Sequence, residues 1–399
     1  MARGRGGFIG QDGLNAPDSP TGVSGTSGDS SVSVAFTAPT DVGGSAITGY
    51  RAQSNTGVGA SGTSSPINVT GLSNGTSYTF NVWAINAFGY SAPSDASSGV
   101  TPSVPDRAFW FGRTTVNVFY SNIATLGNTT DWGYAMRYAA SRAGIASSAT
   151  RAVQSGYDFS TSNAAARLIE QMNLSTAGTG TNFGQLSVTS SQSNWGLSNG
   201  TRGLLSQGYD SSASYSNVIE YVTIASAGNG TDFGDQTVAR VLASACASTT
   251  RGVANGGFVS GANQSNIIDY VTIASAGNAT DFGDLSTAFN GTASSSNSIR
   301  GIIAGGDGAS FSQSNEIQYI TIASTGNTSD FGDLTHGLRY GSSGSNATRC
   351  LIAGEYSGNS NGINYITIAS TGNAADFGDL TNAETNSTSC ASTAHGGIS

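Results

Sequence analysis

The sequence predicts an all-β protein in which a two-sheet sandwich is followed by a β-propeller of four-stranded sheets. A unit of about 49 residues recurs through the last three quarters of the chain, which is typical of a ring or stack of similar modules. Short alternating strands separated by turns fill the segment before it. The composition agrees, because 56 of the 399 residues are Gly and only 10% are charged.

The repeat is defined by a motif that reads YVTIASAGNATDFGD in its clearest form. We number its six copies from the amino end: 120–134, 171–185, 221–235, 270–284, 319–333 and 365–379. The aromatic residue near the motif's end recurs in steps of 51, 50, 49, 49 and 46, at Trp132, Phe183, Phe233, Phe282, Phe331 and Phe377. Six copies predict six blades, and seven blades remain an alternative.

Four strand-like stretches fit in one period, which is the size of a propeller blade. Around copy 4 they are 238–248, 251–257, 267–275 and 280–285, each bounded by Gly, Asn, Ser or Asp. The chain enters the repeats within a blade and ends in an unfinished copy. We therefore expect residues 382–399 to pair beside 107–134 and to close the ring, which removes both open sheet edges.

The chain is expected to contain three parts. Residues 1–15 read as an extended arm that cannot bury enough apolar surface to fold alone. The arm is either a disordered tail or a peg that uses Phe8 and Ile9 as anchors in a neighbouring protein. Residues 16–103 form the sandwich, and residues 104–399 form the propeller. The segment 100–107, which carries two Pro residues, is predicted to be a short, stiff linker.

The sandwich segment resembles a fibronectin type III domain. The resemblance rests on GLSNGTSYTFNVWAIN (71–86) and on the closing PSDASSGVTP. Tyr78, six residues after Leu72, stands where that family places its tyrosine corner, while Phe36 replaces the family's usual core Trp. The resemblance implies a fold of about seven strands and no chemistry.

The repeats resemble the kelch repeat, and more closely a divergent form found in tail-fibre and virion proteins of bacteriophages, cyanophages included. The shared order is a strand, a Gly pair, a variable loop, a Tyr-containing strand and an aromatic turn, with the diglycine kept in GGF (256–258) and GGD (305–307). The kelch Trp before the last turn is mostly Phe here. The resemblance implies a virion protein with a propeller.

Two repeated residues are predicted to be structural. An Arg opens the second strand of each period, and an Asp precedes the motif's Phe-Gly. We expect the Asp side chains to accept backbone hydrogen bonds; an ion pair with the Arg is the alternative. The residues are Arg151, Arg202, Arg251, Arg300, Arg349, Asp232, Asp281, Asp330 and Asp376.

No catalytic, cofactor or metal site is predicted. The Asp-Phe-Gly triplet is not that of a kinase, because it recurs and the chain contains no Lys. Three GxSxG strings are chance matches, since no helix follows their Ser. Doublets such as Asp232/Asp235 are a weak calcium alternative. The enzymatic alternative is a glycan hydrolase (depolymerase). Such an enzyme needs two carboxylates that converge on one site, and Glu residues are scarce in this chain.

The variable loops after the glycine position are the candidate binding surface. Exposed aromatic rings there can stack on sugars while Asp and Asn side chains bind hydroxyl groups, although ordinary loop packing explains them equally well. The candidates are Tyr157, Asp158, Phe159, Tyr209, Asp210, Tyr215, Phe258, Asn263, Phe311 and Tyr356.

The charge and hydropathy of the sequence argue against some classes of partner. The net charge of −9, with all 15 basic residues Arg, argues against a nucleic-acid surface. No apolar run is long enough to span a membrane, and the first residues lack the apolar core of a secretory signal. Of the three Cys residues, Cys246 and Cys390 occupy the same place in the repeat and are expected to be small core residues.

These observations predict a non-enzymatic bacteriophage virion protein, made in the host cytoplasm. Its arm binds other neck, tail or capsid proteins, and its propeller displays a platform for a host-surface receptor or glycan, as in a neck or tail fibre. A capsid decoration protein is the alternative, and a homo-oligomer is possible. An intracellular kelch-like scaffold is disfavoured by the arm and the Lys-free surface.

Overall fold

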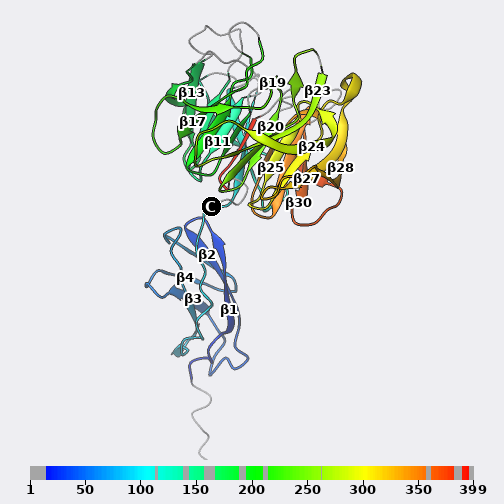
Figure 1. Cartoon of the computed structure of the whole chain (residues 1–399). Coiled ribbons are helices and arrows are strands. Elements are labelled where there is room, and N and C mark those ends of the chain that lie inside the picture. The colour runs from blue at the N-terminus through cyan, green and yellow to red at the C-terminus, as the bar shows by residue number, and fades with distance from the viewer. Residues whose placement is uncertain are drawn as a thin grey trace, which may run out of the picture. The chain divides into compact units, whose positions relative to one another are not determined.

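A computed structural model describes residues 15–112, 116–137, 143–156, 167–187, 195–209, 214–261, 263–355, 361–381 and 389–394 (Figure 1). The chain divides into two compact units, Met1–Pro105 and Asp106–Ser399, with the division inside the Pro-containing segment 100–107. Phe8 and Ile9 lie outside the described residues. The described residues form strands and turns without an α-helix. They contain no helix that is long and apolar enough to cross a membrane.

The first unit is a sandwich of two antiparallel sheets. One sheet has the order β1-β2-β5 and the other β4-β3-β6-β7. The strands are β1 (Thr21–Gly28), β2 (Ser31–Thr37), β3 (Gly49–Ser54), β4 (Gly59–Gly62), β5 (Ile67–Thr70), β6 (Phe80–Asn86) and β7 (Gly89–Tyr90). The expectation of about seven strands in two sheets is confirmed.

Alternation along these strands builds the sandwich core. In β6, Phe80, Val82 and Ala84 are fully buried while the residues between them are half-buried, as the period of two requires. Phe36, in the place of a Trp, packs on Tyr50 with ring centroids 4.8 Å apart. The hydroxyl oxygen of Tyr78 accepts a hydrogen bond from the Ser73 N–H at 3.0 Å, which is the tyrosine-corner contact.

The second unit is a series of four-stranded antiparallel sheets, one for each copy of the motif. In the sheet of copy 1, β8 (Arg107–Phe111), β9 (Asn117–Asn122) and β10 (Thr130–Ala135) are joined by β32 (Ser389–Ser392). Copy 2 has β11 (Gly144–Ser147), β12 (Arg151–Ser155), β13 (Leu168–Asn173) and β14 (Thr181–Gln185). Copy 3 has β15 (Gly196–Ser198), β16 (Arg202–Ser206), β17 (Val218–Thr223) and β18 (Thr231–Asp235).

The sheets of copies 4 to 6 have longer strands. Copy 4 has β20 (Ser244–Ala247), β21 (Arg251–Asn255), β23 (Asn263–Thr272) and β24 (Thr280–Phe289), with β19 (Arg240–Val241) and β22 (Phe258–Val259) added at one end. Copies 5 and 6 share β28 (Ser329–Ser345), which ends one sheet and begins the next. Their other strands are β25 (Ala293–Ser296), β26 (Arg300–Ala304), β27 (Ser314–Thr321), β29 (Arg349–Glu355), β30 (Gly362–Thr367) and β31 (Ala375–Asp379).

The predicted strands around copy 4 are right in number and partly wrong in their bounds. The predicted stretch 238–248 is broken at Leu242, whose φ of +57° interrupts the extended backbone between β19 and β20. β23 begins four residues earlier than predicted, because Asn263 and Gln264 pair with the added strand β22. β24 continues past the predicted end at residue 285, because Phe289 pairs with Ser265.

Neighbouring sheets pack face to face, and the aromatic residue of each motif lies between them. Phe282 of copy 4 is buried together with Ile303 and Ile320 of copy 5, and Phe233 of copy 3 with Val271 of copy 4. Cys246 joins the first of these clusters, and burial raises the pKa of its thiol to about 12. The cores of this unit therefore lie between sheets, which explains why strands such as β21 are buried on both faces.

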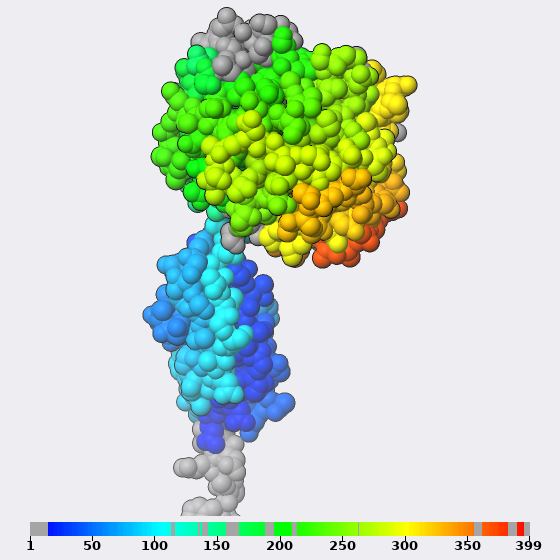
Figure 2. Space-filling view, viewed as in Figure 1, coloured from blue at the N-terminus to red at the C-terminus, as the bar shows by residue number. Residues whose placement is uncertain are grey.

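The sheets follow one another in the order of the chain. Their first strands touch in the sequence β11, β15, β20, β25, β28 and β32, and β32 in turn touches β11. In Figure 2 the surface passes from green through yellow to orange, so successive copies adjoin on this face. Each sheet remains open, since no sheet of the described residues closes on itself. β32 pairs with β8, with Cys390 opposite Trp110 and Ser392 opposite Ala108.

A set of three hydrogen bonds, here called the turn latch, joins most neighbouring copies. Between copies 3 and 4, the N–H groups of Gly277 and Ala279 donate to the carbonyls of Phe233 and Asp235, each at 2.7 Å. The Asn278 Oδ1 atom accepts from the Asp235 N–H at 3.0 Å. The same latch joins copies 2 and 3, 4 and 5, 5 and 6, and 6 and 1.

The latch explains the Gly of the motif's last turn. Gly283 has φ +148°, and a Cβ atom on it would lie 2.4 Å from the carbonyl oxygen of Gly326 in the next copy. Only a residue without a side chain permits this approach of two backbones. The sequence period is thus matched by a repeated contact between one copy and the next.

Candidate functional site

The repeated Arg residues bind the next copy rather than an acidic side chain. The guanidinium of Arg251 lies 4.3 Å from the ring centroid of Tyr270, and its Nη1 donates to the Ile322 carbonyl of copy 5 at 2.8 Å. Arg202, Arg300 and Arg349 make the same two contacts, and within the described residues Arg151 makes the hydrogen bonds without the ring contact.

The expected roles of the repeated Asp residues are wrong. Asp232, Asp281, Asp330 and Asp376 are exposed, and within the described part of the chain their carboxylates form neither the backbone hydrogen bonds nor the ion pairs that the sequence suggested. The Asn of the turn latch accepts a backbone hydrogen bond three residues later, from the N–H of Asp235 in copy 3 and of Asp284 in copy 4. An exposed carboxylate gains little free energy from an ion pair, because water already solvates it. The Asn oxygen at the latch faces a backbone N–H group at a fixed position.

We expect Arg251→Ala to lower the free energy of unfolding by about 1–2 kcal/mol, because it removes a cation–π contact and a hydrogen bond to the next copy. Asp281→Ala should leave the melting temperature unchanged, since Asp281 is exposed. Thermal unfolding followed by circular dichroism checks both variants. An equal loss of stability in the two would mean that an Arg–Asp pair exists after all.

The structure brings two pairs of the predicted loop residues together. Tyr209 and Tyr215 face each other within one loop of copy 3, with ring centroids 5.4 Å apart. Phe258 of copy 4 and Phe311 of copy 5 come from different copies, with centroids 6.1 Å apart. Tyr157, Asp158, Phe159, Asp210 and Tyr356 lie outside the described residues.

Phe258 and Phe311, here called the aromatic pair, form the more exposed of the two pairs. Phe311 is 57% exposed and Phe258 is half-buried. Ser310 and Phe311 have φ of +60° and +57°, a conformation that costs energy in residues other than Gly, so the loop holds the Phe311 ring outward at a cost. Gln264 Nε2 donates to the Gly308 carbonyl at 2.9 Å and ties the two loops together. Asn263 is exposed next to this contact.

Phe258 is placed by the small strands β19 and β22 that are added to the sheet of copy 4. β22 pairs with β19 on one side and with β23 on the other, so that Val241 lies opposite Phe258 and Phe258 opposite Gln264. The position of Phe258 therefore depends on what fixes β19, which begins at Arg240.

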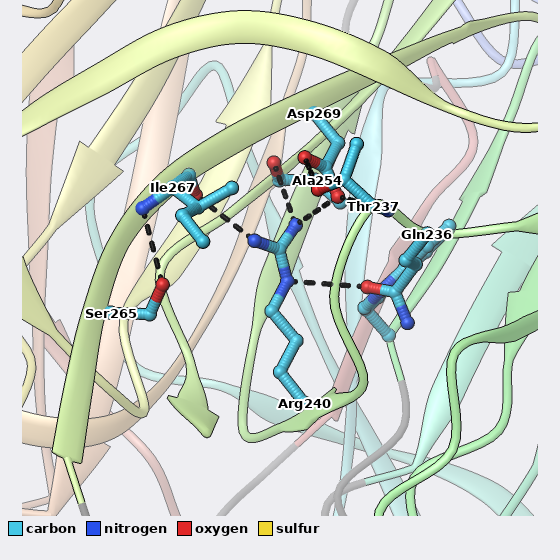
Figure 3. Close-up of polar contacts among 8 residues, drawn as sticks. Gln236, Thr237, Arg240, Ala254, Ser265, Ile267 and Asp269 are labelled. Atoms are coloured by element: carbon cyan, nitrogen blue, oxygen red, sulfur yellow. Dashed lines mark hydrogen bonds and ion pairs between the residues drawn. The ribbon is translucent and has the colours of Figure 1, made fainter. Parts of the chain in front are cut away.

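Arg240 fixes β19 through a buried ion pair with Asp269 (Figure 3). Its Nη2 lies 2.9 Å from Asp269 Oδ2, and the two side chains are 0% and 2% exposed. Further donations from Arg240 reach the Ile267 carbonyl at 3.2 Å and Gln236 Oε1 at 3.3 Å. Burial lowers the pKa of Arg240, and the charge of Asp269 opposes that shift. Thr237 Oγ1 donates to the second oxygen of Asp269 at 2.6 Å.

Sequence reasoning missed Arg240, although a comparison between copies contains the signal. One and five residues after the motif, copy 4 has Leu285 and Phe289, and copy 5 has Leu334 and Leu338. Copy 3 has Gln236 and Arg240 at these two positions. Two polar residues that replace two apolar core residues together indicate a buried polar network.

The site offers apolar ring faces with an amide group beside them. Such a surface can stack on the apolar face of a sugar ring and bind its hydroxyl groups. The described residues contain no group of three or more His, Cys, Asp or Glu side chains that could hold a metal ion.

Comparison with known proteins identifies the first unit. Residues 18–100 match the fibronectin type III family. These residues are a fibronectin type III domain. Domains from titin in a crystal structure are 34% identical over 22% of this chain, with a TM-score of 0.21, and the chain spans 32% of that titin chain. Comparison with curated proteins gives no match.

The second unit has a relative in fold. A structure of YjhT is 11% identical, with a TM-score of 0.53, and the alignment covers 66% of this chain and 92% of that one. Since the first unit ends at Pro105, an alignment of that extent includes much of the second unit. At this identity the likeness concerns the fold alone.

Proposed function

We propose that the second unit is a six-bladed β-propeller closed by β32. The support is the cyclic order in which the first strands touch and the pairing of β32 with β8. The turn latch between copies 6 and 1, in which the Gly127 N–H donates to the Phe377 carbonyl at 2.9 Å, repeats the latch between other neighbours. A closed ring leaves no exposed edge at the meeting point of its ends.

We infer that the chain is a non-enzymatic structural protein of a bacteriophage virion, a neck or tail fibre whose propeller displays a glycan-binding surface. The observation that carries the binding role is the aromatic pair: the exposed Phe311 ring is held outward by an unfavourable backbone, and Phe258 lies on β22, which pairs with the strand that begins at the buried Arg240. Strain of this kind persists where the surrounding structure enforces it, often at binding sites. The virion role is supported by the resemblance of the repeats to phage fibre proteins.

Phe311→Ala is expected to weaken glycan binding by about tenfold or more, because a stacking ring contributes roughly 1–2 kcal/mol. Glycan-array binding of the full chain measures the loss, and Tyr90→Ala, which removes an exposed ring of the first unit, is the control. Unchanged binding in Phe311→Ala, or loss in both, would count against the aromatic pair.

Two further outcomes favour the alternative functions. If the intact chain binds no glycan and labelled virions carry it in many copies, a capsid decoration protein becomes the better interpretation. Product formation from the bound glycan would instead indicate a hydrolase.

A further inference from the structure

The junction between copies 1 and 2, here called the seam, lacks the turn latch that the other junctions share. The latch joins every other pair of neighbours, including copies 6 and 1. At the seam, the described residues form none of its three hydrogen bonds. Two positions of the motif differ there. Thr179 stands where the five other copies have Asn, and Tyr134 stands where they have Asp or Gln.

The repeated Arg contact is missing at the same junction. In copies 2 to 6 the guanidinium donates to a carbonyl of the following copy, as Arg349 does to the Ile123 carbonyl of copy 1 at 3.0 Å. Arg107 is the counterpart in copy 1, and its guanidinium lies 5.1 Å from the ring centroids of Tyr120 and Trp132. Within the part of the chain that the structure describes, this guanidinium donates to no carbonyl. Copy 1 therefore keeps the ring contact and lacks the bond to copy 2.

The backbones of copies 1 and 2 also lie farther apart than those of other neighbours. In copies 2 to 6, a Cβ atom on the Gly of the motif's last turn would lie 2.0–2.5 Å from a backbone atom of the next copy. On Gly133, the counterpart in copy 1, the nearest atom would be the Cβ of Ala177, at 3.7 Å. The Tyr134 ring explains the gap, because it lies against the neighbouring turn: a Cβ on Gly178 would be 3.5 Å from Tyr134 Cε2.

A cavity of about 540 Å³ opens at the seam. Tyr134 of copy 1 lines it, together with Thr176, Gly178 and Thr179 from the turn that carries the latch in other copies. A space of this size admits water to the backbone of the turn. Exposed backbone groups are typical of segments that open locally.

Two hydrogen bonds still cross the seam. The Arg137 N–H donates to Glu170 Oε1 at 2.7 Å, and Tyr134 hydrogen-bonds to the backbone of Asn173. The first bond is not an addition, because the next two junctions have its counterpart, a residue after the motif that donates to a buried carboxylate of the next copy. One added bond therefore stands against the three bonds of the latch and the bond of the Arg.

We propose that the second unit opens at the seam before it opens at any other junction. Opening there parts copy 1 from copy 2 and exposes the apolar cluster between them, in which Met136 and Met172 are 5% and 1% exposed. The latch between copies 6 and 1 stays formed meanwhile. The seam joins two copies that follow one another in the chain, so this inference depends neither on the glycan surface nor on closure by β32, and each can fail alone.

The test is oxidation by hydrogen peroxide of buried methionines in the full-length Ile320→Met variant, followed by mass spectrometry of peptides. A buried thioether reacts when the structure around it opens. Met172 and Ile320 occupy the same position of the motif and are 1% and 2% exposed. Met172 lies at the seam, whereas Ile320 packs on Phe282 across the latched junction of copies 4 and 5. We expect Met172 to oxidise at least about tenfold faster than the introduced methionine, because opening the seam breaks fewer hydrogen bonds.

Ile320→Met leaves the seam unaltered and nearly conserves side-chain volume, so the variant should fold as the parent does. Equal oxidation of the two methionines, or faster oxidation of the introduced one, overturns the proposal.

A second substitution tests the cause. Asn327→Thr gives copy 5 the latch residue of copy 2 and removes the acceptor of the Asp284 N–H. Combined with Ile320→Met, it should speed oxidation of the introduced methionine by about threefold or more. An unchanged rate would show that the latch does not hold junctions closed, and the proposal would fall with it.

Discussion

Truncation of the chain before Ser389 is expected to lower the free energy of unfolding of the second unit by at least about 4 kcal/mol, a large part of the 5–15 kcal/mol typical of a domain. The truncation removes β32, whose residues pair with β8 and bury Ala391. It also removes Ser392, whose Oγ donates to the Ser345 carbonyl at 2.7 Å and whose carbonyl accepts from Ser147 Oγ at 3.1 Å. One short strand thus joins copies 6, 1 and 2.

Calorimetry measures this effect as a fall of roughly 10 °C or more in the melting temperature of the second unit. The matched control is a truncation before His395, which leaves all of β32 in place and should melt as the parent does. If the longer truncation also melts with the parent, β32 is dispensable and the proposed ring closure is wrong. The fibronectin type III domain has its own core and is expected to be unaffected in both proteins.

Asp269→Ala is expected to lower the free energy of unfolding by about 3–5 kcal/mol, because it leaves Arg240 charged and unpaired in a buried site. It should also weaken glycan binding, since Arg240 begins β19 and β19 positions Phe258. Urea unfolding of the purified chain, with glycan binding measured on the same samples, checks both effects. Unchanged stability would show that the ion pair does not form.

The chain supplies a control for this variant. Copy 4 has Leu285 and Phe289, followed in copy 5 by Gln318, where copy 3 has Gln236 and Arg240, followed in copy 4 by Asp269. The triple variant Gln236→Leu, Arg240→Phe and Asp269→Gln replaces the charged set by this uncharged one and should be nearly as stable as the parent or more stable. A loss as large as that of Asp269→Ala would mean that packing around the site, and not the unpaired charge, is what fails.

The period of the repeat was enough to predict the strands of each copy and their approximate number. Each of these depends on the local order of strand and turn residues, and that order recurs in every copy. The sandwich was equally accessible, since alternation in 78–84 and the tyrosine corner are local features. The bounds of β19, β23 and β24 were not accessible, because they depend on pairing with the added strand β22 and on the φ of Leu242.

The roles of the repeated polar residues were harder to predict, because sequence does not reveal which atom a side chain meets across a junction. An Arg and an Asp in most copies invite an ion pair, yet in copy 4 the Arg meets a Tyr ring and a carbonyl while the Asp is exposed to solvent. The Asn278 Oδ1 atom instead accepts from the backbone N–H of the last residue of the motif, Asp235 in copy 3. The most informative residue of the site is one that departs from the period, Arg240.

The most direct test of the account is a disulfide between the two ends of the second unit, because the proposed propeller requires them to be neighbours. Ala108 of β8 lies opposite Ser392 of β32, and directly opposed residues of antiparallel strands have Cα atoms about 4.5–5.5 Å apart, within the reach of a disulfide. In Ala108→Cys/Ser392→Cys, mild oxidation should give an intramolecular crosslink in nearly every molecule, detected by mass spectrometry of the joined peptides. A double-Cys protein that stays reduced, or that crosslinks only between molecules, would contradict the closed ring.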